Sequence, residues 1–270
     1  MTKQKLICGV ALTSMLFTAG TLTPAMAEMS INDEKCNVTL NYDVTVEPKK
    51  LQISDNGSEK YRVELDQLYV DGKKVTLNAK QQTLLTQYSD ELSRQVPEVI
   101  DLVGDVVVMA SQAVNMALTP IFGDATGSQI DKLMTGIQKR IDTMAYQQGD
   151  KFYLGSTESS IEHAFNEEFE QEIEQMVTNS MGSLMMTLGS QIMSSEGGSF
   201  EEKMNTFSQK MDNVGKDIEQ QLESQSQGLE QRADKICDNF EGLLVLESQV
   251  RKDIPELAPY TLAKLGELKE

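Results

Sequence analysis

The hydrophobic period of the chain changes at Asn78, which divides the sequence into a β part and a helical part. Between residues 36 and 77 apolar and polar side chains alternate, the period of half-buried strands. Asn56-Gly57 and Asp71-Gly72 are two-residue hairpin signals in this stretch. After residue 78 apolar side chains recur every three or four positions, as on one face of a helix. The sequence therefore predicts an α+β fold: a small N-terminal antiparallel β-meander followed by a long, mostly helical bundle with a coiled-coil-like C-terminal helix.

Local signals predict where the helices begin and end. Asn78 with Gln81 fits an N-terminal cap, and Pro97 is expected to restart the first helix. A break is expected at Pro120 and Gly123. A further helix is expected over about residues 128–147, a short connection over 149–155, and the most helical part of the chain from residue 157 onward.

The last helix carries a heptad seam. Ser199 with Glu202 forms a capping box, and apolar residues then recur in steps of four and three from residue 200 to residue 243. A straight helix over residues 200–247 would be about 72 Å long, whereas a compact chain of this size is roughly 45 Å across. We therefore expect this helix to protrude, or to bend at Gly215 or Gly228.

The segment 1–27 is typical of a secretory signal peptide. Lys3 and Lys5 precede an uncharged apolar stretch, and Ala25-Met26-Ala27 is a small-x-small cleavage pattern. We expect export to the periplasm and the organisation 1–27 signal peptide, 28–77 β-meander and 78–270 helical region, the last packed with the sheet as one unit. Cleavage leaves 22 basic and 42 acidic side chains, a net charge of −20.

Two cysteines remain after cleavage, Cys36 and Cys237. In an oxidising compartment such a pair is most simply a disulfide, which would join the first strand to the last helix. Two separately buried thiols are the alternative. There is no Cys-x-x-Cys motif, so the sequence gives no indication of catalytic thiol chemistry.

Composition disfavours several functions. The acidic balance makes nucleic acid an unsuitable partner, because binding it depends on Lys and Arg that neutralise phosphates. The motifs of serine hydrolases, P-loop proteins, dinucleotide-binding proteins and EF-hands are missing. We expect no enzyme, no cofactor, no catalytic residue and no metal site.

Two groups of polar residues are candidate sites. Asp101 and Asp105 lie one helical turn apart and could bind a cation, but with Gln112 and Asn115 they also form the solvated stripe of an otherwise apolar helix. That stripe predicts a core helix with a wet edge and no membrane span. The lone histidine, His163, precedes Glu167 by one turn, and a surface pair is the favoured interpretation.

Seven glutamates between residues 158 and 174 have no Lys or Arg among them. They either attract a cation or a basic partner, or serve only as a solvated helix face, which is the favoured interpretation. They are Glu158, Glu162, Glu167, Glu168, Glu170, Glu172 and Glu174.

Methionines concentrate in the segment 176–211, which holds seven of the twelve that remain after cleavage. Flexible thioethers fill cores, which is the default interpretation, and also suit promiscuous apolar surfaces. A weak candidate interaction surface consists of Met181, Met185, Met186 and Met193.

The chain resembles the YggN-like proteins of proteobacteria, in segments spread over most of its length. The segments are Cys36–Leu40, Leu68–Leu77, Gln82, Tyr88, Val96-Pro97, Asp234–Cys237 and Leu246–Ser248. The resemblance implies a Gram-negative periplasmic protein with cysteines near both ends. It supplies no catalytic residue, because the function of these proteins is unassigned.

We therefore expect a soluble, non-enzymatic, envelope-associated binding, scaffold or chaperone-like module with an unknown protein or envelope partner. The alternatives are a metal-binding protein or hydrolase that uses scattered carboxylates, and self-association through the seam at residues 200–243.

Overall fold

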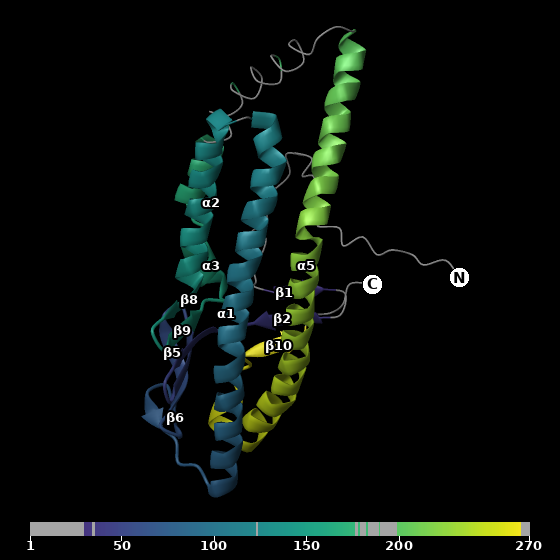
Figure 1. The fold of residues 1–270 in the computed structure, drawn as a ribbon. Helices are drawn as coiled ribbons and strands as arrows, with labels where there is room; N and C mark the ends of the chain where they lie inside the picture. Colours follow the sequence, from purple (N-terminus) through teal and green to yellow (C-terminus); the bar gives the residue numbers. More distant parts are fainter. Residues whose placement is uncertain are drawn as a thin grey trace, which may run out of the picture.

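The computed structural model describes residues 30–33, 36–122, 124–175 and 199–265, together with positions 178, 182 and 189. It contains an N-terminal antiparallel sheet followed by a mostly helical region, so the α+β expectation is confirmed. Figure 1 shows the strands in the lower half of the view, beside long helices that extend beyond them.

The predicted meander forms the main sheet, with a tight turn between each pair of strands. Asn56 and Gly57 both have positive φ, as do Asp71 and Gly72, so both predicted hairpin turns are confirmed. Val44 pairs with Ile53, an alignment that puts the apolar positions of neighbouring strands on one buried face. The strands are β3 (Asp43–Glu47), β4 (Lys50–Asp55), β5 (Ser58–Glu64), β6 (Gln67–Val70) and β7 (Lys73–Lys74).

One connection expected from the sequence is instead a hairpin of this sheet. The helix predicted to reach residue 147 ends at Met144, and β8 (Ala145–Gln148) and β9 (Lys151–Leu154) follow it. β9 pairs with β3, with Phe152 opposite Val46, and the turn between β8 and β9 uses Gly149 at a φ of 60°. The prediction was wrong because pairing with the free edge of β3 decided the conformation of this short apolar stretch.

The alternating stretch at residues 36–46 is divided between two sheets: residues 43–46 lie in β3, whereas residues 36–40 belong to a second, three-stranded sheet. Here β2 (Cys36–Leu40) lies between β1 (Ser30–Asp33) and β10 (Ala263–Leu265). The sequence does not predict β1 and β10, because their apolar patterns are too short to read. Their pairing brings the beginning and the end of the described chain together.

The first helix, α1 (Ala79–Phe122), is 44 residues long and continuous. Its predicted cap is confirmed, since the Gln81 N–H donates to Asn78 Oδ1 at 3.0 Å and the Asn78 N–H donates to Gln81 Oε1 at 2.9 Å. The restart at Pro97 is wrong, because the helix runs through that residue. The break expected at Pro120 and Gly123 is found after Phe122, where α1 ends two residues beyond Pro120. A proline inside a helix costs about 3 kcal/mol, and burial of the apolar face around Pro97 offsets that cost.

Two further helices follow. α2 (Asp124–Met144) begins four residues before the predicted start, and α3 (Glu158–Ala164) is capped by Thr157. The predicted run from residue 157 is interrupted at Phe165, after which residues 167–175 are again helical. Asn166 starts this second piece, because its Oδ1 accepts from the Phe169 N–H at 3.2 Å.

The last helix, α5 (Phe200–Asp253), has 54 residues and begins with the predicted capping box of Ser199 and Glu202. It stays helical through Gly215 and Gly228 and extends beyond the strands (Figure 1). At 1.5 Å per residue it spans about 81 Å. It runs antiparallel to α1, as the ion pair of Lys80 with Asp253 at 2.8 Å shows.

The core lies where the main sheet, the first half of α1 and the last third of α5 meet. Tyr61 from β5 and Tyr88 from α1 are fully buried there, with 2.9 Å between their hydroxyl oxygens. Ile236, Phe240 and Leu243 are the buried side chains of the seam on α5. The last part of the predicted seam, from Ile236 to Leu243, is thus used by the chain's own core.

Candidate functional surfaces

The methionines proposed as an interaction surface lie outside the described residues. This holds for Met181, Met185, Met186 and Met193. The described part of the chain offers other candidates: polar clusters, a cleft, buried carboxylates and an apolar stripe.

The polar candidates prove to be surface features. His163 and Glu167 are both exposed, and the break at Phe165 separates their helices, with no hydrogen bond or ion pair between the two among the described residues. All seven glutamates of the acidic run are exposed, in agreement with a solvated face. Glu172 is held by Arg140 at 3.0 Å.

The two aspartates of α1 lie on an exposed side of the helix. Asp101 and Asp105 are both exposed, and Asp105 forms an ion pair with Arg232 of α5. Within the described part of the chain, no group of three or more His, Cys, Asp and Glu side chains could hold a metal ion.

Cys237 on α5 is buried and disulfide-bonded. Cys36 begins β2, a strand that contacts α5, but its side chain lies outside the described residues.

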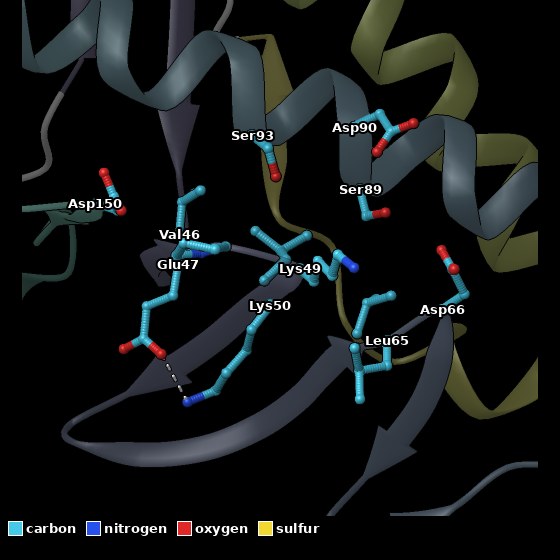
Figure 2. Close-up of a pocket in the computed structure, with 13 residues that line it drawn as sticks. Val46, Glu47, Lys49, Lys50, Leu65, Asp66, Ser89, Asp90, Ser93 and Asp150 are labelled. Atoms are coloured by element: carbon cyan, nitrogen blue, oxygen red, sulfur yellow. Dashed lines mark hydrogen bonds and ion pairs between the residues drawn. The ribbon is translucent and has the colours of Figure 1, made fainter.

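A polar cleft of about 670 Å³ lies between α1 and the hairpin turns of the main sheet. Figure 2 shows Ser89 and Ser93 on α1 across from Lys49 and Leu65 on two neighbouring turns. Lys49 and Leu65 both have left-handed backbones, and the Leu65 N–H donates to the Lys49 carbonyl at 2.9 Å. The two turns therefore hold each other at the mouth of the cleft.

The chemistry of this cleft does not select a ligand. Its acidic side chains outnumber its lysines, and Glu47 already binds Lys50 at 3.4 Å. Ser89 donates to a carbonyl of its own helix, that of Thr86, at 3.1 Å. A serine used in this way, without a histidine beside it, is not an activated nucleophile.

Two buried carboxylates serve the fold. Asp43 is 2% exposed and accepts from the N–H groups of Ser156 and Thr157 at 2.9 and 3.0 Å and from the hydroxyls of Thr157 and Ser160 at 2.9 and 2.8 Å. It thereby fixes the start of α3 against β3. The sequence does not single out Asp43 or its neighbours, because their contacts join residues more than a hundred positions apart.

The second carboxylate holds the C-terminal segment. Glu247 of α5 is 3% exposed and accepts from the Leu262 N–H at 2.6 Å and the Ala263 N–H at 3.3 Å. Burial raises the pKa of the Glu247 carboxyl, and the two backbone hydrogen bonds oppose that rise. The contact aligns β10 for its pairing with β2.

The most unusual surface is an apolar stripe on α1. Because an α-helix has 3.6 residues per turn, two residues separated by five full turns lie on the same side of the helix. Tyr88 is 1% exposed, whereas Val106, five turns further on, is 43% exposed. Likewise Leu92 is buried, whereas Ala110 is exposed.

The rest of the stripe follows the same rule. Ala113 and Ala117 are partly buried and lie five turns after the buried residues Gln95 and Val99. The face of α1 that packs in the core is thus only partly covered about 27 Å further along the helix.

The last helix behaves in the same way. Its apolar seam is buried from Ile236 onward but only partly buried at Val214, Ile218, Leu222 and Leu229. Figure 1 shows the reason: α1, α2 and the first part of α5 extend past the strands that cover the core. We call residues 101–122, α2 and residues 200–232 the arm.

We call its uncovered stripes the arm surface. The arm surface consists of the exposed residues Val106 and Ala110 and the partly buried residues Ala113, Ala117, Val214, Ile218 and Leu222.

Within the described residues one segment, Ala79–Leu118 of α1, is long and apolar enough to cross a membrane by length and composition, and 22% of its most apolar window is buried. Core helices of soluble proteins meet the same criterion. Asp101 and the Asp105–Arg232 ion pair lie along this stretch, where a bilayer would make them costly.

The fold and these surfaces define a two-sheet α+β protein with a long helical arm and no constellation of catalytic groups among its described residues. The chain belongs to the family described as "Protein of unknown function (DUF2884)", whose model matches residues 36–263. Neither the curated proteins nor the solved structures contain a match.

Proposed function

We propose that this protein is a periplasmic, non-enzymatic binding module of the cell envelope that holds apolar segments of other polypeptides on its arm surface, in the manner of a chaperone. The observation that carries the proposal is the loss of cover along α1. The sector that buries Tyr88 and Leu92 continues as Val106, 43% exposed, and as exposed Ala110. Apolar area removed from water contributes roughly 25 cal/mol per Å², so an uncovered stripe favours association with another apolar surface.

The size of the side chains suits a weak, reversible contact. Three of the four stripe residues on α1 are alanines, which bury little area each. The seam on α5 adds larger but half-buried residues, Ile218 and Leu222. Such a surface favours transient holding of many segments over tight binding of one.

The test is the suppression of aggregation of an unfolded periplasmic client by the mature protein. We expect suppression that rises with dose, and we expect Val106→Glu combined with Ala110→Glu to need at least threefold more protein for the same effect. Val245→Glu is the matched control, because Val245 is an equally apolar residue, 62% exposed, near the other end of α5. Circular dichroism establishes that all variants are folded.

Two outcomes contradict the proposal. No suppression at a severalfold molar excess of the wild-type protein would remove the function. Equal loss in the arm variant and the Val245→Glu control would show that general surface charge, and not the arm surface, is responsible.

The periplasmic address is supported by the signal-peptide pattern of residues 1–27 and by the resemblance to the YggN-like proteins, which we propose as the narrower relatives of this chain. Cell fractionation tests it: the processed chain is expected in the osmotic-shock fluid. A chain that stays in the cytoplasm would contradict it.

We also infer that Cys237 pairs with Cys36. Cys237 is buried and disulfide-bonded, and the other cysteine, Cys8, lies in the segment expected to be removed. The contact between β2 and α5 supports the pairing. Peptide mapping without reductant is expected to recover the two cysteines in one linked pair; two free thiols after denaturation would contradict it.

A further inference from the structure

The arm carries a net negative charge as well as an apolar surface. Its three segments together carry 12 acidic and 7 basic side chains: 2 and 0 in residues 101–122, 3 and 3 in α2, and 7 and 4 in residues 200–232. Two of these cations already have acidic partners, because Arg140 pairs with Glu172 at 3.0 Å and Arg232 pairs with Asp105. The field around the arm surface is therefore negative.

Acidic side chains also flank the apolar seam itself. On α5, Asp217 and Glu223 are exposed beside Ile218 and Leu222, which belong to the arm surface. A partner that covers these apolar residues brings its own rim next to the two carboxylates. Like charges at such a rim repel, and opposite charges speed association and select the partner.

We propose that the occupant of the arm surface is a basic, amphipathic segment of another polypeptide. This rests on the proposed function and narrows it from any apolar segment to one whose polar side carries Lys or Arg. Charge repulsion disfavours the other occupants: a second copy carries the same net negative charge, and an anionic lipid surface is also negative.

The experiment compares two synthetic peptides with the same leucine face, one with lysines and one with glutamates on its polar side. Their binding to the full mature protein is measured by fluorescence anisotropy at low and high salt. We expect the lysine peptide to bind about tenfold more tightly at roughly 20 mM salt, and the difference to shrink below about threefold at roughly 300 mM, because salt screens exposed charges.

A variant without the two carboxylates tests whether they cause the preference for the lysine peptide. Asp217→Asn with Glu223→Gln is expected to reduce the preference for the lysine peptide about threefold. The matched control is Asp90→Asn with Glu256→Gln, which removes the same charge from exposed positions away from the arm and should leave the preference unchanged.

The failures are distinguishable. Equal binding of both peptides overturns the charge inference and leaves the proposed function standing, whereas binding of neither removes both. Binding to vesicles of anionic lipid in place of the lysine peptide would make a membrane surface the occupant and overturn the inference. Light scattering could instead give the mass of a dimer for the wild type and of a monomer for the Val106→Glu, Ala110→Glu variant. That result would make a second copy the occupant and overturn the inference.

Discussion

At the scale of single residues, two buried carboxylates connect parts of the chain that are distant in sequence. Asp43 collects four donors from the segment around the start of α3, and Glu247 collects two from the segment at the start of β10. A buried donor that loses its acceptor costs about 1–3 kcal/mol. Neither residue belongs to the arm surface, so their effects belong to stability.

Asp43→Ala is expected to lower the free energy of unfolding by about 3 kcal/mol, because it leaves the buried N–H groups of Ser156 and Thr157 without their acceptor. Urea denaturation measures the change. Glu98→Ala, at an exposed position of α1, is the control and should stay within about 0.5 kcal/mol of the wild type. If the two variants are equally stable, Asp43 does not anchor α3.

The buried carboxyl of Glu247 should make the stability of the fold depend on pH. Its pKa is raised in the folded state by burial, so the folded protein takes up its proton at a higher pH than the unfolded chain does. Its contribution to stability is therefore greatest below the unfolded pKa and is lost as the pH rises through the folded value.

The measurement is the free energy of unfolding of the wild type and of Glu247→Gln between pH 7 and pH 5. The stability of the wild type relative to this variant should rise as the pH falls, because Gln does not titrate and the other groups change equally in both proteins. A relative stability that falls over this range would contradict the raised pKa.

At the scale of secondary-structure elements, α1 and α5 are each one continuous helix with a part that packs in the core and a part that lies in the arm. The half beside the sheet is held by deep burial, as at Leu243, which is 1% exposed. The half in the arm has the same hydrophobic period but only partial cover. A helix that is continuous can transmit the order of its packed half to the uncovered one, because helix propagation is cooperative.

Leu243→Ala is expected to cost about 2–5 kcal/mol, since it leaves a cavity in the core. Val245→Ala, at the exposed position two residues away on the same helix, should stay within about 0.5 kcal/mol of the wild type. Thermal or urea unfolding measures both. Similar losses at the two positions would show that the core does not lie on the Leu243 side of α5.

At the scale of the whole molecule, the protein is elongated because α5 is longer than a compact chain of this size is wide. A uniform rod of about 81 Å has a radius of gyration of about 23 Å, whereas a compact chain of about 243 residues has one of about 18 Å. Small-angle scattering of the mature protein should therefore give a value above about 20 Å. A value at the compact limit would mean that the arm folds back in solution.

The sequence by itself determined what depends on neighbours along the chain. The β-meander, its Asn-Gly and Asp-Gly turns and the two helix caps follow from side-chain period, positive φ and local hydrogen bonds, and all were predicted. Within the candidate site, the apolar period of α1 and the seam on α5 could also be recognised in the sequence, because helical spacing is visible without knowing what the helix packs against.

Only the tertiary structure decided what depends on distant contacts. It made β9 a strand by pairing it with β3, carried α1 through Pro97 by burying both sides of it, and chose Asp43 and Glu247 as anchors. It also decided which part of each stripe is covered. Tyr88 and Val106 occupy the same side of one helix, so the hydrophobic period of the sequence cannot show that the first is buried and the second exposed. That difference depends on where the sheet ends.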